Sequence, residues 1–364
     1  MPGEKQGKVR FVGFTAHKDP AFHLKMLELG YPFDTVQMPP MKYRQLGRTS
    51  LTVSRLCYGT WQFGGDWGSF ETREAQGAIR HALELGITFF DTAQAYGFGM
   101  SERVLGEALR SELRNQRDKV ILATKGGLRL EGGKLLRDAS ARWLRQGVEQ
   151  SLRNLGVDYI DLYQLHWPDP RTPLEETAEA MREFVTEGKV RFVGVSNFDV
   201  DQMREFEKTR KIDTLQPPYH LFRRDIEKEI LPYCQEHGIG VLVYGPLAHG
   251  LLGGRYTPQT TFATNDWRNG SPAFRGELFE RNLGVVARLR SLADRQGITA
   301  PQLAIAWVLA NPAVDVAIVG ARHPQQLTQT APAADVELSE ETLQEIAQIM
   351  KDAAATGGPS PEGM

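Results

Sequence analysis

Cysteine, long apolar runs and an excess of either charge are all scarce in this 364-residue chain. Its two cysteines, Cys57 and Cys234, show no Cys-x-x-Cys or mixed Cys/His spacing, so neither a disulfide framework nor a structural zinc site is indicated. No apolar run approaches the ~20 residues of a membrane span, and the N-terminus MPGEKQGKVRF lacks the apolar core of a signal peptide. We therefore expect a cytoplasmic protein with reduced thiols.

The formal net charge is only -2, which provides no global field to recruit nucleic acid or an anionic membrane surface. None of the eight histidines lies in HExxH or a comparable ligand spacing, so no metal is expected. The 41% of hydrophobic residues are enough for a large core. These features favour a soluble globular protein with a small-molecule partner, and they leave the oligomeric state open.

From residue 51 onward, short β-rich runs alternate with amphipathic helical stretches, which is typical of a parallel sheet covered by helices. The candidate strands are residues 55–60, 87–92, 119–124, 159–166, 190–196, 213–218, 239–245 and 315–320. Eight such units predict a closed (β/α)8 barrel, the TIM barrel. The alternative, an open doubly wound sheet, would place GxGxxG after its first strand, and this motif is absent.

The segments around the barrel carry their own predictions. Residues 41–54 precede the first barrel strand and are expected to form a hairpin that closes the bottom of the barrel. A helix is predicted at 338–350, so the barrel domain spans 41–350. The Gly- and Pro-rich tail, residues 351–364, is expected to be disordered.

An internal repeat sets the N-terminus apart. The heptapeptide GKVRFVG occurs twice, at 7–13 and at 188–194, and each copy is followed at nearly the same spacing by DTVQMPP or DTLQPPY. A repeat seen once does not indicate a solenoid. Because a closed barrel has no free edge for another strand, residues 1–40 are expected to form a poorly ordered arm outside it, a partial repeat of 188–219.

Polar residues at consecutive strand ends are the first catalytic candidates, since the active site of a (β/α)8 barrel forms at those ends. Asp91 closes the second strand, Tyr96 follows in the next loop, Lys125 closes the third strand and His166 the fourth. Any one of them alone would be read as a capping or ion-pairing residue. Four of them at neighbouring ends favour a catalytic set.

The motifs GTWQFGG, FFDTAQAYGFGMSERVLGEAL, ATKGG, DYIDLYQLHWPD, GVSNF and YGPLAHGLLGG resemble those of the aldo-keto reductase superfamily, of the bacterial NADPH-dependent type, over about residues 41–350. The resemblance implies an oxidoreductase that transfers a hydride from NADPH to an aldehyde or ketone. It implies Tyr96 as proton donor, Lys125 and Asp91 as its tuning pair, and His166 as the residue that orients the substrate.

This grouping has a chemical reason. A phenol with a pKa of about 10 is a reluctant acid near neutrality. The ammonium of Lys125 is expected to lower the pKa of Tyr96, and Asp91 to keep Lys125 charged. Hydrogen bonds from Tyr96 and His166 would then stabilise the negative charge that develops on the carbonyl oxygen.

The resemblance also implies a cofactor site for NADPH or NADP+. Amides and hydroxyls would hold the nicotinamide, a loop after the seventh strand would cover the pyrophosphate, and arginines would pair with phosphates. The helix start HPQQL offers free backbone N–H groups for a 2'-phosphate, which favours NADPH. The candidate cofactor-binding residues are Trp61, Ser196, Asn197, Gln216, Tyr244, Gly245, Pro246, Leu247, Gly250, Arg255, Arg268, Gly320, Arg322 and Gln326.

The substrate would meet aromatic walls at the first and fourth strand-end loops, where Trp61, Phe63, Trp67 and Trp167 lie. At the other end of the cofactor, relatives commonly carry Glu-Asn where this chain has Gln329 and Thr330, so the adenine contacts stay open.

Two other functions were weighed. A nucleotide-binding regulatory barrel with little turnover is disfavoured by the complete set of four candidate catalytic residues. A hydrolase or lyase with two catalytic carboxylates is disfavoured because no Asp/Glu pair lies at neighbouring strand ends. The physiological substrate and the favoured direction stay open.

Overall fold

Eight parallel strands form a closed barrel in the computed structural model, which describes residues 13–15, 35–37 and 41–358. In order around the barrel they are β5 (Leu56–Gly59), β6 (Phe89–Asp91), β7 (Ile121–Gly126), β10 (Ile160–Leu165), β11 (Val190–Ser196), β12 (Thr214–Gln216), β13 (Gly240–Tyr244) and β14 (Val316–Gly320). β14 pairs with β5 and closes the ring. All eight predicted strands and the predicted barrel are confirmed, and the open doubly wound sheet is wrong.

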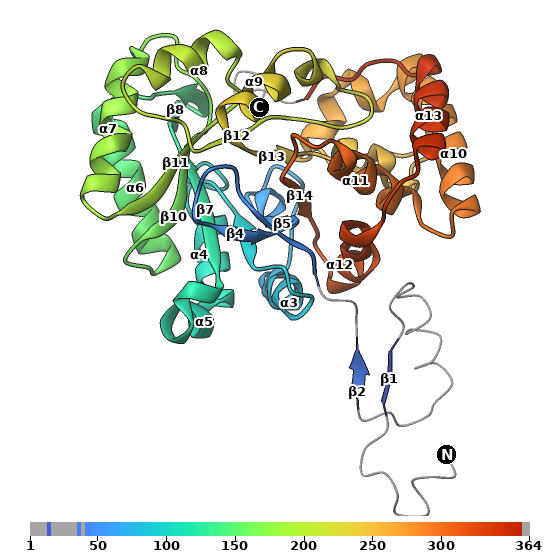
Figure 1. Cartoon of the computed structure of the whole chain (residues 1–364), viewed down its shortest axis with the longest axis horizontal. Coiled ribbons are helices and arrows are strands. Elements are labelled where there is room, and N and C mark those ends of the chain that lie inside the picture. The colour runs from blue at the N-terminus through green and yellow to red at the C-terminus, as the bar shows by residue number, and fades with distance from the viewer. Residues whose placement is uncertain (1–12, 16–34, 38–40, 359–364) are drawn as a thin grey trace, which may run out of the picture. The chain divides into compact units, whose positions relative to one another are not determined.

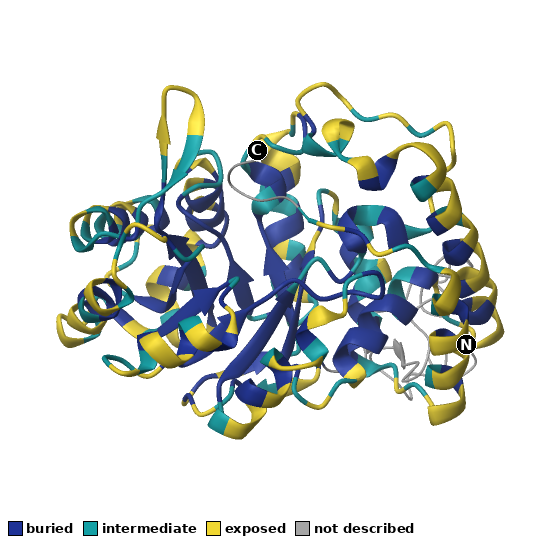
Figure 2. Cartoon of the chain, turned by 90° about the horizontal axis from the view of Figure 1, so that it is seen from above, coloured by how far each residue is buried: buried dark blue, intermediate teal, exposed yellow. Residues whose placement is uncertain are grey.

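Helices surround the strands, with their buried faces inward and their exposed faces outward (Figures 1 and 2). They are α3 (Thr72–Glu84), α4 (Met100–Ala108), α5 (Arg110–Asn115), α6 (Ala141–Leu155), α7 (Leu174–Thr186), α8 (Val200–Glu207), α9 (Ile230–His237), α10 (Gly276–Arg295), α11 (Ala300–Ala310), α12 (Pro324–Thr330) and α13 (Glu340–Ile349). α6 shows how the sequence sets their ends. The Ser140 hydroxyl caps its N-terminus by accepting from the Trp143 N–H, and Gly156, at φ +68°, ends it.

A hairpin closes the N-terminal end of the barrel, as predicted. β3 (Tyr43–Gln45) pairs antiparallel with β4 (Thr52–Ser54), and apolar residues of this hairpin pack into the same core cluster as inward-facing residues of the strands. The turn is tight at Gly47, where φ is +50° and a Cβ atom would lie 2.3 Å from the backbone nitrogen of Gly240. Only the opposite end, where the strands terminate, is left for a site.

A second hairpin, absent from the sequence predictions, follows the third barrel strand. β8 (Leu128–Glu131) and β9 (Lys134–Arg137) pair antiparallel across the dipeptide Gly132-Gly133, in which both residues have positive φ. Two such residues form the primed turn that suits a two-residue hairpin. The hairpin rises from the C-terminal end of β7, so it borders the site.

The predicted disorder of residues 351–364 is wrong for residues 351–358. The buried Asn282 side chain exchanges two hydrogen bonds with the backbone of Ala354, at 2.9 and 3.0 Å, and the Thr356 N–H donates to the Phe222 carbonyl. A composition rich in Gly and Pro does not reveal that α10 offers such partners. Residues 359–364 lie outside the described part of the chain.

The chain divides into two compact units, Met1–Lys42 and Tyr43–Met364. In the first, the described residues form a parallel pair, β1 (Gly13–Thr15) and β2 (Thr35–Gln37). The other residues of the predicted arm lie outside the described ones.

The register of this pair repeats that of the barrel. Gly13 lies opposite Thr35, just as Gly194 of β11 lies opposite Thr214 of β12. The sequence repeat is therefore also a repeat of strand pairing.

Candidate active site

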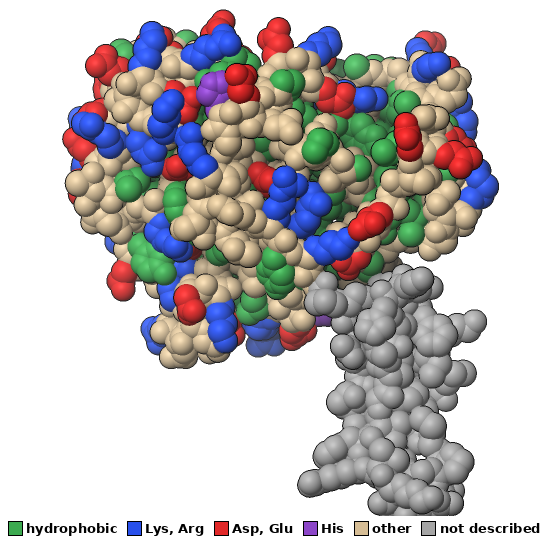
Figure 3. All heavy atoms as spheres, viewed as in Figure 1, with side chains coloured by type: hydrophobic (Ala, Val, Ile, Leu, Met, Phe, Trp, Pro, Cys, Tyr) green, Lys and Arg blue, Asp and Glu red, His purple; other side chains and the backbone are tan. Residues whose placement is uncertain are grey.

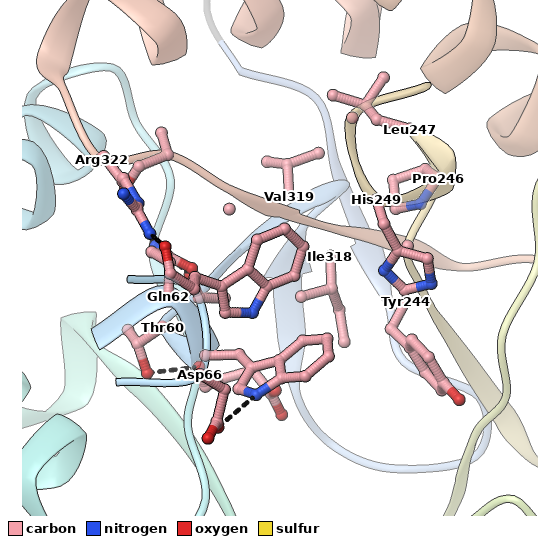
Figure 4. Close-up of a pocket in the computed structure, with 18 of the residues that line it drawn as sticks. Thr60, Gln62, Asp66, Tyr244, Pro246, Leu247, His249, Ile318, Val319 and Arg322 are labelled. Carbon is pink, nitrogen blue, oxygen red and sulfur yellow. Dashed lines mark hydrogen bonds between the residues drawn. The ribbon is translucent and has the colours of Figure 1, made fainter. Parts of the chain in front are cut away.

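A cavity of about 1090 Å³ lies at the C-terminal ends of the barrel strands, where the site was predicted. Figure 4 shows part of its lining, drawn from the loops after β5, β13 and β14. The predicted site residues other than Lys125 and Phe63 line it: Trp61, Trp67, Asp91, Tyr96, His166, Trp167, Ser196, Asn197, Gln216, Tyr244, Gly245, Pro246, Leu247, Gly250, Arg255, Arg268, Gly320, Arg322 and Gln326. Lys125 is buried at its floor.

A buried ion pair lies at the floor of the cavity. The Lys125 ammonium donates to the Asp91 carboxylate at 2.5 Å and to the Tyr96 hydroxyl at 3.5 Å. The second carboxylate oxygen of Asp91 accepts from the Gln216 amide at 3.0 Å. Lys125 is 1% exposed and Asp91 2%. The ion pair and its hydrogen bonds offset the cost of burying both side chains.

Tyr96 is held over this pair by its loop and by two rings. The loop turns through Gly97 and Gly99, both at positive φ. Trp61 stacks on the Tyr96 ring with centroids 6.1 Å apart, and the His166 ring meets it edge-on at 5.6 Å. The phenol therefore has one defined position at the cavity floor.

The pKa of Tyr96 is raised well above its usual value, mainly by burial and then by the carboxylates of Asp91 and Asp66. The sequence analysis expected the opposite, because it counted the ammonium of Lys125 but neither the burial of the phenol nor the effect of these carboxylates on it. In the described protein Tyr96 is a neutral phenol and keeps its proton.

His166 is a neutral imidazole. Burial and the neighbouring Lys125 ammonium lower its pKa well below the usual value. Within the described residues its Nδ1 atom is buried without a hydrogen-bond partner. The ring also lines the cavity, so it can contact a ligand that enters there.

The residues predicted to hold the nicotinamide form one hydrogen-bonded group at the ends of β11, β12 and β13. The Asn197 amide donates to the His166 carbonyl at 3.1 Å and accepts from the Tyr244 hydroxyl at 2.9 Å. The Ser196 hydroxyl donates to the Gln216 carbonyl at 2.7 Å. Asn197 has φ +62°, a conformation that asparagine tolerates better than most residues.

Two backbone N–H groups just before α12, which the prediction took as free, already have a partner. The Gln326 side-chain oxygen accepts from the N–H groups of Arg322 at 2.7 Å and His323 at 3.3 Å. A phosphate at this place would have to displace Gln326 or bind the Arg322 side chain. Gln329 and Thr330 also line this end of the cavity.

Arg268, predicted to pair with phosphate, already has a carboxylate partner. It forms two hydrogen bonds with Asp266, at 2.9 and 2.5 Å, and its guanidinium lies 4.5 Å from the centre of the Trp67 ring. The backbone N–H of the adjacent Trp267 donates to the backbone carbonyl of Asp66 at 3.1 Å. These contacts join the segment around residue 267 to the loop after β5.

Asp66 and His249 are among the cavity residues that the sequence analysis missed. Each stands alone in a Gly-containing loop, so no spacing pattern pointed to it. Phe63, predicted as an aromatic wall, is instead fully buried and packs against Phe70 at 5.2 Å. The side chain two positions before it, Trp61, faces the cavity instead.

Charges of both signs are mixed on the face of the molecule shown in Figure 3, where Lys and Arg side chains are interspersed with Asp and Glu. None of the helices that the structure describes combines the length and the hydropathy required of a transmembrane span. In the same part of the chain, no three His, Cys, Asp or Glu side chains lie close enough together to hold a metal ion.

Comparisons with known proteins agree with this geometry. A sequence model of the aldo/keto reductase family matches residues 55–351. Aldo-keto reductase YhdN of Bacillus subtilis (strain 168) is 42% identical over 314 residues, which cover 86% of this chain and 94% of the relative. The NADH-specific methylglyoxal reductase of Escherichia coli (strain K12) is 34% identical over 320 residues, covering 82% and 95%. The structure of the glycerol dehydrogenase AKR11B4 from Gluconobacter oxydans is similar with a TM-score of 0.79 and 37% identity, covering 87% and 98%.

Proposed function

This chain belongs to the aldo/keto reductase family of oxidoreductases, whose members use nicotinamide cofactors, and from that premise we propose that it reduces the carbonyl group of an aldehyde or ketone with NADPH. The observation that carries the proposal is the neutral phenol of Tyr96 above the buried Lys125–Asp91 ion pair, at the floor of a large cavity. When bound, the nicotinamide supplies the hydride.

The protein's own groups handle the proton and the charge. Tyr96 holds a proton on its hydroxyl oxygen and passes it to the substrate oxygen as negative charge develops there. Lys125, 3.5 Å from that hydroxyl, stabilises the phenolate that remains. His166 donates a hydrogen bond to the same substrate oxygen and fixes the orientation of the carbonyl.

The cavity residues fit the cofactor at both ends. Its volume of about 1090 Å³ has room for a dinucleotide beside a small carbonyl compound. The hydrogen-bonded group of Ser196, Asn197 and Gln216 offers amides and hydroxyls next to Tyr96 and His166. At the far end the Arg322 side chain lines the cavity, which supports NADPH rather than NADH.

The test is the loss of absorbance at 340 nm when NADPH, the protein and a panel of aldehydes and ketones are mixed. Tyr96→Phe should lower kcat by about 100-fold or more, because general acid catalysis contributes that much, and should leave NADPH affinity nearly unchanged. Tyr159→Phe removes a phenol hydroxyl outside the cavity lining and is the matched control.

Turnover by Tyr96→Phe within a few-fold of the unmodified protein would contradict the role of Tyr96. NADPH binding without turnover of any carbonyl compound would instead favour the regulatory barrel.

A further inference from the structure

Asp66 is a charged side chain in the substrate part of the cavity that has no role in the proton transfer described above. We propose that its negative charge makes the enzyme select neutral and cationic carbonyl substrates over anionic ones, an inference that rests on the proposed function. Asp66 lies in the loop after β5, and its carboxylate accepts a hydrogen bond from the Trp61 indole at 3.1 Å (Figure 4). Trp61 in turn stacks on Tyr96, so one ring separates the carboxylate from the phenol.

The charge of Asp66 is not cancelled by a neighbour. No Lys, Arg or His of the described chain lies within ion-pair distance of its carboxylate, whereas Asp91 is paired with Lys125 and Asp266 with Arg268. Burial raises the pKa of Asp66, and the hydrogen bond from Trp61 opposes that shift. The net charge of the groups around Tyr96 is therefore set by Asp66.

The remaining walls of this part of the cavity give little electrostatic compensation. The lining side chains on the hairpin β8–β9 and in the loops around it are apolar: Phe98, Leu128, Leu130, Leu135 and Trp167. Arg137 lies 5.1 Å from the Trp167 ring centre but is not among the lining residues. The other lining cations are Arg255, Arg268, Arg290 and Arg322. Of these, Arg268 is paired with Asp266, and Arg322 donates to the Trp67 carbonyl rather than to Asp66.

The field of Asp66 reaches the place where the carbonyl oxygen would bind. It is one of the carboxylates that raise the pKa of Tyr96, which is the group that meets that oxygen. A substrate whose second charged group lies about 6–8 Å from Asp66 in a partly desolvated site would gain or lose about ten- to hundred-fold in binding, according to its sign.

The experiment uses three benzaldehydes of similar shape, with a 4-carboxymethyl, a 4-(2-hydroxyethyl) or a 4-(trimethylammoniomethyl) group, in which a methylene group insulates the carbonyl from the substituent. For the unmodified protein we expect kcat/KM for the cation to exceed that for the anion by about ten-fold or more. Asp66→Asn keeps an acceptor for the Trp61 indole but removes the charge, so this ratio should fall close to one. Asp66→Glu restores the charge and should restore the preference. Asp201→Asn, which makes the same charge change on exposed α8, is the matched control and should keep the ratio.

A ratio in Asp66→Asn within two-fold of the unmodified value would overturn the inference. Failure of the proposed function is recognised separately, because then none of the aldehydes is reduced. In that case the binding of benzyltrimethylammonium and of phenylacetate is measured by quenching of tryptophan fluorescence. The cation should bind about ten-fold more tightly or better to the unmodified protein, and this difference should vanish in Asp66→Asn. Equal binding of the two ions by the unmodified protein would also overturn the inference.

Discussion

Arg322 is the residue on which the choice of cofactor depends most directly. Its side chain lines the cavity and donates to the Trp67 carbonyl. Burial lowers its pKa, and the positive charge of Arg268 adds to that effect. Two neighbouring cations with only the Asp266 carboxylate between them favour the arrival of a further anion, such as a 2'-phosphate.

Arg322→Ala should therefore weaken NADPH binding about ten-fold or more, since a charge-assisted hydrogen bond to phosphate contributes on the order of 1.5–3 kcal/mol. NADH lacks that phosphate and should lose little. Fluorescence titration with both cofactors measures the difference. Arg204→Ala, on exposed α8, controls for the loss of one positive charge. Equal weakening of NADH binding and NADPH binding would show that Arg322 does not contact the 2'-phosphate.

Single residues also mark the limit of what the sequence could predict about the site. Asp91, Lys125 and His166 were predictable because the ends of consecutive parallel strands meet at one rim. The raised pKa of Tyr96 was not, because it depends first on the burial of the phenol and then on the carboxylates of Asp91 and Asp66, and Asp66 approaches from another loop. Likewise, the sequence shows that Arg268 is a cation, but only the structure of its loop shows that Arg268 is paired with the Asp266 carboxylate.

Among the elements, the turn after β13 stores the most backbone strain. Ala248, His249 and Gly250 all have positive φ, at +47°, +55° and +98°. A non-glycine residue in this conformation costs roughly 1–2 kcal/mol, so packing must hold it. The His249 ring meets Trp267 edge-on at 4.9 Å, and burial with Arg223 and Arg268 lowers the pKa of His249 to about 3.

This turn should make the fold sensitive to acid. A histidine in the unfolded chain has a pKa of about 6.5, so below that pH the unfolded chain binds a proton at His249 and the folded chain does not. The contribution of neutral His249 to the free energy of unfolding is therefore fully present above about pH 6.5 and decreases as the pH falls below that value. Between pH 7.5 and pH 5.5, His249 alone should lower the free energy of unfolding by about 1.4 kcal/mol.

Urea unfolding at pH 7.5 and 5.5 measures this loss. His249→Asn keeps a residue that tolerates positive φ but does not titrate in this range, so its loss should be smaller by about 1.4 kcal/mol. The same pH dependence in the variant and the unmodified protein would mean that His249 is protonated in the folded state. His220, whose pKa is also lowered well below its usual value, should account for part of what remains.

Elements of regular pattern were predictable, whereas those fixed by distant partners were not. The eight strands followed from apolar runs bounded by turn residues, and α13 from its amphipathic period. The order of residues 353–358 depends on Asn282, more than 70 positions earlier in the chain. The hairpin β8–β9 was missed because its alternation is short and its outer side chains are exposed.

For the whole molecule, the unit Tyr43–Met364 contains the closed barrel, its core and every predicted site residue. Deletion of residues 1–40 should therefore leave kcat, KM and NADPH affinity within about two-fold, the range of changes away from a site. Steady-state kinetics and a melting curve of the truncated protein test this. Loss of NADPH binding or turnover would mean that the arm takes part in the working site.

The repeated register of β1 and β2 has a consequence for how the chain folds. The heptapeptide at 7–13 repeats that at 188–194, and β1 pairs with β2 in the register in which β11 pairs with β12, so the folding chain holds two candidates for one partner. Parallel pairing between distant segments forms slowly, which leaves time for the wrong choice. β1 would then compete with β11 for pairing with β12, and a fraction of the molecules would stay misfolded until β1 dissociates from β12. Because the chain is synthesised from its N-terminus, β1 is available for pairing before β11 has been made.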